Sequence, residues 1–306
     1  MSCRAILTGS YEMMKMQSKV DITPYLLISV AAAILFVLTI YPLIYSLALS
    51  FHKFSIARPG VPWRFVGVKN YAKVFTDPVF WRIILNTLIF SCSTVGLQFV
   101  IGFGLALLFS REVQIRGEGV LRTALILPMM VPPILVGLIW LFMYKKDFGI
   151  INNILWMLNV GPVTWLSKPF IAFLAIIAAE TWEWTPFMFL LLLAGLRSLP
   201  SDIYESSEVD GASTWQIFRY VTVPLLKPII AVALIIRFMD AFRIFDMIFQ
   251  LTGGGPGVAT ETISLYIYRN GFRYFDMGFA SALSYIALII IVLFTNVYIR
   301  VLRRAT

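Results

Sequence analysis

The stretch LPSDIYESSEVDGASTWQIFRYVTVPLLKP, residues 199–228, is polar and acidic and lies between two long apolar stretches. It predicts two short helices separated by a turn. Ser201 is placed to cap the first helix, and Asp202 and Glu205 lie in its first turns, where the helix dipole favours anions. Gly211 is typical of the residue that follows a helix C-terminus.

The second helix of this stretch is predicted to begin at once, because Ser213 and Gln216 have the spacing of a capping box. Pro224 and Pro228 then restrict the chain as it enters the next apolar stretch. Two amphipathic helical pieces in this position form either an ordinary structured loop or a docking element for a soluble partner.

The composition of the whole chain indicates a membrane protein. Of its 306 residues 59% are hydrophobic and 13% charged, and the mean hydropathy is +0.85, whereas soluble domains carry about 25% charged residues. The net charge of +9 is explained by basic groups that flank membrane spans. With His52 as the single histidine and Cys3 and Cys92 as the cysteines, no His-based metal cluster or catalytic triad is available.

Six stretches are long and apolar enough to cross the bilayer as helices, so we expect an all-α integral membrane protein. The expected spans are residues 25–50, 81–110, 122–144, 169–196, 224–250 and 279–299.

The segments between the spans predict how the chain is oriented. Residues 1–24 and 300–306 are expected to be cytoplasmic tails, and residues 51–80 a loop on the outer face. Lys and Arg number 12 in the inner segments and 10 in the outer ones, which decides little. The orientation is favoured mainly by the basic tail after the last span. Translation starts at Met1 or at one of three nearby methionines, namely Met13, Met14 and Met16.

The acidic stretch resembles the EAA motif of permease subunits of binding-protein-dependent ABC importers. That motif is Glu-Ala-Ala, three residues, Gly, nine residues and Ile-x-Leu-Pro, and the spacing here fits without a gap, with Ser for both Ala residues and Val for Ile and Leu. The Asp-Gly-Ala variant around the glycine is typical of the carbohydrate-importing branch. The resemblance implies that the ATPase-coupling residues are Glu205, Ser206, Ser207, Asp210, Gly211, Ala212 and Pro224.

Two further stretches are similar to this family. Residues 245–262, which contain Gly-Gly-Gly-Pro-Gly, resemble the loop between the last two spans of MalF/UgpA-like permeases, and residues 184–196 also match. The resemblance covers about residues 25–299 and implies the type I ABC importer permease fold, with a core over residues 81–299.

The resemblance also implies a set of partners. These are a second, MalG/UgpE-like permease subunit, two cytoplasmic ATPases that use ATP and Mg, and an extracytoplasmic solute-binding protein that delivers a sugar, oligosaccharide or glycerol-3-phosphate-like solute. The implied location is a bacterial or archaeal cytoplasmic membrane. The chain has no Gly-x-x-x-x-Gly-Lys-Ser/Thr loop, so we expect it to be no enzyme itself and to bind no cofactor or nucleic acid. The rival hypothesis is a gradient-driven secondary transporter that works without ATPases.

Charges within the expected fifth span are candidates for the substrate pathway. Arg237, Asp240, Arg243 and Asp246 follow one another at i, i+3, and four unpaired charges facing lipid are costly. They either pair along the helix as a structural ladder, line an aqueous pathway or contact the second permease.

Polar and aromatic residues in other spans complete the candidate pathway. Glu183 lies between Trp182 and Trp184; carboxylates and aromatic rings suit sugars, although an interfacial aromatic belt with one solvated acid is the favoured interpretation. Asn86 and Gln98 either face the cavity or join helices.

Prolines and glycines in the spans predict bends and close contacts. Pro128, Pro132 and Pro133 in the third span permit bending, and Gly102 and Gly104 in the second are expected to allow close helix packing.

Overall fold

The computed structural model describes residues 23–57, 62–110 and 117–305, with side chains up to residue 300. The methionines considered as translation starts therefore lie outside the described residues, as does the beginning of the charged loop after residue 110. The chain divides into two compact units, residues 1–49 and residues 50–306.

The first unit contains one long helix. It runs from Pro24 to Ser50 and has the apolar character of a membrane span, which confirms the expected first span. It consists of α2 (Thr23–Leu35), a π-helical turn η1 (Phe36–Ile40) and α3 (Tyr41–Ser50).

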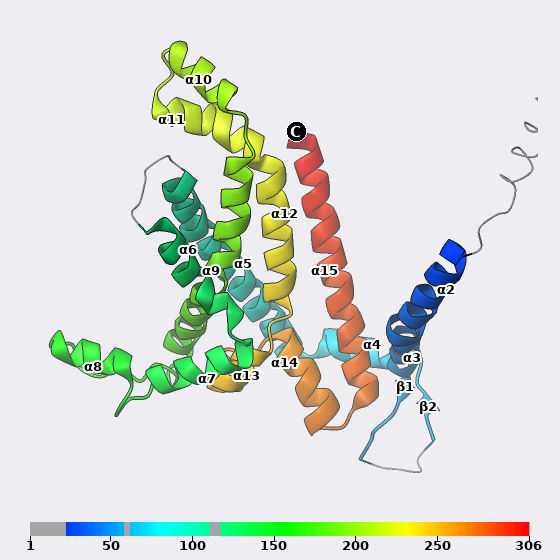
Figure 1. Cartoon of the computed structure of the whole chain (residues 1–306). Coiled ribbons are helices and arrows are strands. Elements are labelled where there is room, and N and C mark those ends of the chain that lie inside the picture. Colours follow the sequence, from blue (N-terminus) through cyan, green and yellow to red (C-terminus); the bar gives the residue numbers. More distant parts are fainter. Residues whose placement is uncertain (1–22, 58–61, 111–116, 306) are drawn as a thin grey trace, which may run out of the picture. The chain divides into compact units, whose positions relative to one another are not determined.

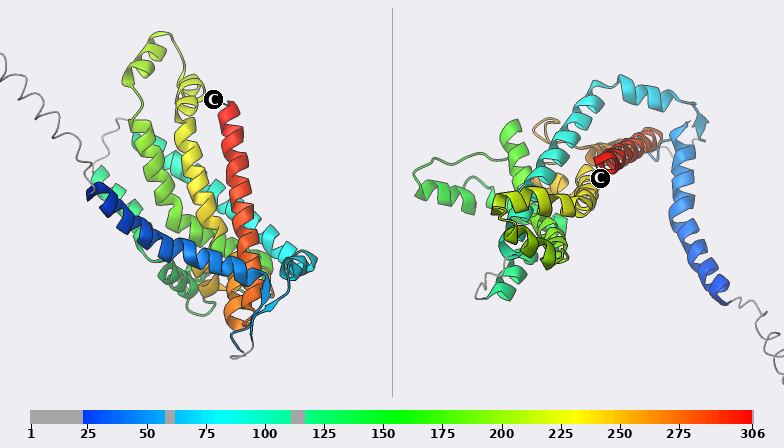
Figure 2. Two further views of the ribbon diagram at one scale, coloured as in Figure 1. Left: turned by 90° about the vertical axis from the view of Figure 1, so that its right-hand side faces the viewer. Right: turned by 90° about the horizontal axis from the view of Figure 1, so that it is seen from above.

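The second unit is built on four long helices that run side by side. They are α5 (Pro78–Ser110), α9 (Pro169–Arg197), α12 (Val223–Phe242) and α15 (Met277–Ala305), and they remain adjacent in two perpendicular views (Figures 1 and 2). Shorter helices complete the unit: α4 (Lys69–Thr76), α6 (Glu118–Ile126), η2 (Leu127–Met130), α7 (Pro133–Met143), α8 (Ile150–Met157), α10 (Ser201–Val209), α11 (Thr214–Ile217), η3 (Phe218–Thr222), α13 (Asp246–Leu251), α14 (Ile263–Tyr268) and η4 (Arg269–Arg273).

The two ends of this bundle are different. Helices α10 and α11 and the C-terminal end of α15 lie at one end, whereas α4, α7, α8, α13 and α14 lie at the other (Figure 1). Between the ends, four clusters of buried apolar side chains in the described residues pack α5 against α9, α12, α13 and α15. Apolar packing of this kind positions the polar groups described below.

Five helices in the described residues are long and apolar enough to cross a membrane. The expected second, fourth and sixth spans are confirmed by α5, α9 and α15. The expected third span is wrong as a single helix. Two helical segments, Glu118–Met130 and Pro133–Met143, are long and apolar enough to cross a membrane only when they are taken together. They meet at an angle of 97°. The reason is Pro132 and Pro133, which the sequence had indicated as a place for bending.

The expected fifth span, residues 224–250, is displaced. The helix begins ten residues earlier, at Thr214, and ends at Phe242. Pro224 therefore lies inside a continuous helix, directly after the π-helical turn η3. At the other end Arg243 is the C-cap of the helix, and a new helix, α13, begins at Asp246.

The expected outer loop, residues 51–80, contains two short strands and helix α4. Strands β1 (His52–Lys53) and β2 (Arg64–Phe65) pair antiparallel, with His52 opposite Phe65. Asn70 on α4 donates to the His52 carbonyl at 3.0 Å, and Lys73 forms an ion pair with Asp276 at 3.3 Å. Asn70 thus attaches the strand β1 to α4, and the ion pair of Lys73 attaches α4 to the residue before α15.

Two glycines of α5 lie in different surroundings. A Cβ atom on Gly102 would be 2.7 Å from Cβ of Met188 and 3.0 Å from the backbone nitrogen of Phe189, whereas a Cβ on Gly104 would meet nothing within 4 Å. Close helix packing is therefore confirmed at Gly102 and wrong at Gly104.

We predict that Gly102→Ala separates α5 from α9 and lowers the free energy of unfolding by about 1–3 kcal/mol through overpacking. Gly104→Ala is the matched control on the same helix, and it leaves stability unchanged or raises it by up to about 1 kcal/mol. Thermal unfolding of both variants in detergent measures the difference, and equal melting temperatures would contradict the packing described here.

Candidate functional site

The turn between α10 and α11 is fixed by backbone hydrogen bonds. Gly211 has a φ of +78° and donates to the Glu208 carbonyl at 3.0 Å, while Ala212 donates to the Ser207 carbonyl at 3.0 Å. This pair of bonds is a Schellman motif, which needs a left-handed residue at the position of Gly211. The space around that residue is open, so backbone conformation, not packing, requires glycine here.

The caps of the two helices differ from each other. Ser213 accepts a bond from the Gln216 backbone, and the Gln216 side chain accepts one from the Ser213 backbone, which confirms the capping box. The predicted cap by Ser201 is wrong, because Pro200 occupies the N-cap position and makes no side-chain bond. The Ser201 hydroxyl instead donates to Asp202 at 3.3 Å.

We call residues 201–217, which comprise α10 and α11, the elbow. Its acidic residues are exposed and form no ion pair among the described residues; they are Asp202, Glu205, Glu208 and Asp210. Val209, Trp215 and Tyr220 expose large apolar surfaces in and beside it. Asp210, Gly211 and Tyr220 line a shallow cavity of about 300 Å³.

The serine hydroxyls of the elbow that were expected to take part in coupling form hydrogen bonds within α10. The Ser206 and Ser207 hydroxyls both donate to the Ile203 carbonyl, at 3.1 and 2.6 Å, so both hydroxyls have partners within α10. The Tyr204 hydroxyl donates to Thr222 at 3.1 Å. Because Thr222 belongs to the helix that continues into α12, this bond ties the elbow to the membrane span.

A second polar site is buried in the bundle, where Arg237 of α12 is 1% exposed. Its Nε donates to Oε1 of Gln98 on α5 at 3.0 Å, and its Nη2 donates to Oε1 of Glu180 on α9 at 3.0 Å. The guanidinium lies 4.5 Å from the centre of the Trp184 ring. Three spans therefore meet at one side chain.

A cavity of about 330 Å³ opens beside this cluster. Aromatic, acidic and basic side chains line it together, which provides apolar faces and hydrogen-bonding groups in one place. Its lining includes Glu180, Trp184, Arg237, Asp240, Arg243 and Asp246.

The structure corrects the expected charge ladder. Asp240 does pair with Arg237 at 3.8 Å and with Arg243 at 3.0 Å. Asp246 lies beyond the end of the helix and has no ion pair among the described residues. The main partner of Arg237 is Glu180 on another helix. Sequence reasoning missed this pair because the two residues lie 57 positions apart in the chain.

The other candidate pathway residues lie in different surroundings. Gln98 belongs to the buried cluster, but the Asn86 amide donates to the Val258 carbonyl at 3.0 Å and so fixes the loop before α14. Trp182 is 44% exposed and lies edge-on to Trp140. The favoured interpretation of Glu183 as a solvated acid is wrong, since its carboxylate is buried and accepts no hydrogen bond in the described structure.

The glycine-rich loop before α14 is held by a buried ion pair outside the spans. Arg269 donates to Oε2 of Glu261 at 2.8 Å and to the Gly253 carbonyl at 2.7 Å. Burial raises the pKa of Glu261, and the Arg269 charge opposes that rise. The loop is therefore a defined structure at the end of the bundle opposite the elbow.

Membrane-length helices, a capped elbow and a buried polar cluster define an integral membrane protein of several spans. The model of the family described as "Binding-protein-dependent transport system inner membrane component" matches residues 98–306. The chain belongs to this family.

Relatives and solved structures agree with that assignment. The trehalose/maltose transport system permease protein MalF of Thermococcus litoralis is 42% identical over 277 residues, covering 90% of this chain and 92% of the relative. The sulfoquinovosyl glycerol transport system permease protein SmoG of Agrobacterium fabrum is 36% identical over 278 residues, covering 91% and 89%.

A bacterial alginate ABC transporter, solved in complex with an alginate-bound periplasmic protein, contains a chain that matches with a TM-score of 0.80. It is 26% identical, and the match covers 94% of this chain and 97% of that one. The resemblance to MalF/UgpA-like permeases and the type I ABC importer permease fold are thereby confirmed.

We predict that Arg237→Met lowers the free energy of unfolding by about 3–5 kcal/mol, because it leaves the Glu180 carboxylate buried without its cation. The double variant Arg237→Met/Glu180→Gln recovers most of that loss. Arg243→Met is the control, since its pair with Asp240 is exposed and contributes about 1 kcal/mol or less. Chemical unfolding in detergent compares the three; a double variant no more stable than Arg237→Met would contradict the pairing.

Proposed function

We propose that this chain is the permease subunit of an ATP-driven importer and forms half of a translocation pathway for a sugar, an oligosaccharide or a glycerol-3-phosphate-like solute. The observation that carries the proposal is the elbow. It is fixed by a Schellman turn and a capping box, it exposes acidic and apolar side chains, and it continues without a break into α12.

The proposed partners are inferred from the lack of a phosphate-binding loop sequence and from the exposed surface of the elbow. It has no phosphate-binding loop sequence of the Gly-x-x-x-x-Gly-Lys-Ser/Thr type, so two separate cytoplasmic ATPases supply the hydrolysis of ATP with Mg. Each elbow docks into one ATPase, with Glu205, Asp210 and the Gly211 turn facing it. A second permease of the same fold completes the pathway.

The elbow defines the cytoplasmic side. Both chain termini then lie in the cytoplasm, and α4, the hairpin and the glycine-rich loop face outward, in the cytoplasmic membrane of a bacterium or archaeon. A solute-binding protein delivers the solute to that outer face, which agrees with the alginate transporter solved with a periplasmic protein.

The solute pathway passes the cavity beside Arg237. Sugars present apolar C–H faces and hydroxyl groups, and the cavity offers the Trp184 ring together with Asp240 and Arg243. Arg237 is held by Gln98 and Glu180, so it shapes the wall of the cavity. The names of the trehalose/maltose and sulfoquinovosyl glycerol relatives support a carbohydrate as the solute.

We predict that Gly211→Pro leaves membrane insertion intact but separates the permease from its ATPases. Proline fixes φ near −65°, whereas this turn needs +78°. Gly211→Asn is the matched control, because asparagine tolerates the left-handed conformation and preserves the elbow.

The measurement is the amount of ATPase subunit that co-purifies with the tagged permease, together with the ATP hydrolysis of the purified complex. Gly211→Pro is expected to lose both and Gly211→Asn to keep both. A Gly211→Pro chain that inserts normally and retains a full complement of active ATPase would refute the proposed role of the elbow.

A further inference from the structure

The segment between α7 and α9 carries an exposed apolar surface, which we call the ledge. Trp156 and Met157 are 73% and 74% exposed, and all of its members expose more than half of their surface. The ledge consists of Phe148, Ile150, Ile154, Trp156, Met157 and Leu158. Ile150, Ile154 and Met157 follow one another at i, i+4 and i+7 and so share one face of α8, and an exposed apolar face of this kind marks contact with a partner or with a membrane.

The ledge is rigidly built on its inner side. The Asn152 amide donates to the Val163 carbonyl at 3.0 Å, and its Oδ1 accepts from the Val163 backbone and from the Trp165 indole, both at 3.0 Å. Ile151 packs against the buried core. The inner face is therefore occupied, and both backbone polar groups of Val163 have a partner within the segment, as residence in a poorly hydrated environment favours.

The position of the ledge ties it to the edge of the membrane. It follows α7, which closes the bent pair, and precedes α9, a membrane span that starts at Pro169. Helix α8 projects sideways from the bundle and runs across the direction of α12 and α15, at the end opposite the elbow (Figures 1 and 2). Both ends of the segment are thus attached at the outer end of the spans.

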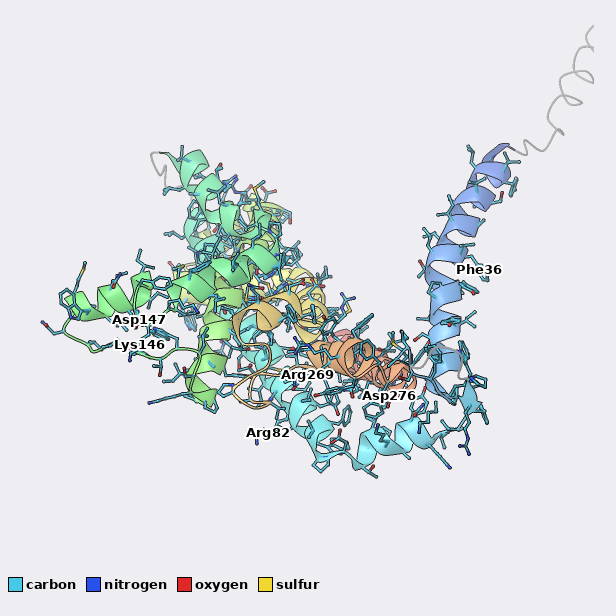
Figure 3. The ribbon with its side chains drawn as sticks, turned by 90° about the horizontal axis from the view of Figure 1, so that it is seen from below. Phe36, Arg82, Lys146, Asp147, Arg269 and Asp276 are labelled. Atoms are coloured by element: carbon cyan, nitrogen blue, oxygen red, sulfur yellow. The ribbon has the colours of Figure 1, made fainter. Side chains whose placement is uncertain are left out.

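Charged residues flank the apolar surface. Lys145, Lys146 and Asp147 come just before α8, and Lys168 just before α9; Figure 3 shows Lys146 and Asp147 at the base of the projecting segment. Exposed Trp, Met and Ile beside Lys is the composition of helices that lie in the interfacial region of a bilayer.

We propose that the ledge lies in the headgroup and upper acyl region of the outer leaflet and holds the outer end of α7 there. Lipid is favoured over a protein partner because the apolar surface continues from two membrane elements and is bordered by amines suited to lipid phosphates. The choice of the outer leaflet rests on the proposed function, which places the elbow in the cytoplasm, whereas the position of the ledge at a membrane surface requires only that the chain spans a membrane.

The test places an environment-sensitive fluorophore on the ledge. The transporter complex carrying Cys3→Ser, Cys92→Ser and Met157→Cys is labelled with NBD and reconstituted into vesicles of phosphatidylethanolamine and phosphatidylglycerol. Matched labels replace Lys53, exposed on the hairpin, and Leu288, exposed on the apolar span α15. Quenching is measured with aqueous iodide and with lipids spin-labelled near the headgroup or near the chain end.

The expected result is that the Met157 label is quenched most by the lipid labelled near the headgroup and little by iodide. The Leu288 label responds more to the chain-end label and the Lys53 label to iodide. Iodide quenching at Met157 equal to that at Lys53 would overturn the proposal. So would protection from both quenchers, which would assign the ledge to a protein partner.

A second measurement avoids the cysteine substitution. Brominated lipids are expected to quench the tryptophan fluorescence of the wild-type complex more than that of Trp156→Phe. Equal fractional quenching in the two would contradict the assignment even if the labelled variants failed to assemble.

Discussion

The bundle depends on the burial of one charge, the Arg237 guanidinium. A cation taken out of water inside a membrane protein is tolerated only with a counter-charge and hydrogen-bond acceptors of good geometry. Glu180 and Gln98 supply these from α9 and α5, and the Trp184 ring covers the guanidinium. The requirement to satisfy Arg237 therefore sets the register of three spans against one another, which apolar packing alone specifies less sharply.

The same helix connects this cluster to the elbow. From Thr214 to Phe242 the chain is one helix, so the distance along it from the capping box to Arg237 is about 35 Å at 1.5 Å per residue. Under the proposed function, a displacement of α11 would be transmitted along this continuous helix to the wall of the cavity. The exposed acids lie on the other side of the Gly211 turn, and the Tyr204–Thr222 hydrogen bond ties their helix, α10, to this continuous helix.

Local sequence patterns predicted the features that depend on residues close together in the chain. The spacing from Ser213 to Gln216 and the position of Gly211 gave the elbow, and hydropathy located four spans closely. Hydropathy missed the break at Pro132, because the residues on both sides of it are equally apolar. The end of the fifth span at Phe242 was missed for the same reason, since α13 continues the apolar run.

Pairings between distant residues were beyond sequence reasoning. Asp240 and Arg243 were expected to interact because they share a helix, but the pairing of Arg237 with Glu180 joins residues 57 positions apart. The burial of Glu183 depends on how α9 faces its neighbours, and its flanking tryptophans indicated an interfacial position instead. The sequence thus predicted the elbow in detail and the pathway only as a set of candidates.

The central claim, that a separate ATPase moves this permease through the elbow, is tested most directly by photo-crosslinking in intact cells. Benzoylphenylalanine replaces Val209, which is 87% exposed in the elbow, and, as a control, Lys53 on the hairpin at the opposite end. The account predicts an adduct with an ABC ATPase subunit from Val209 and none from Lys53. Absence of that adduct in membranes that contain both the permease and the ATPase would contradict it.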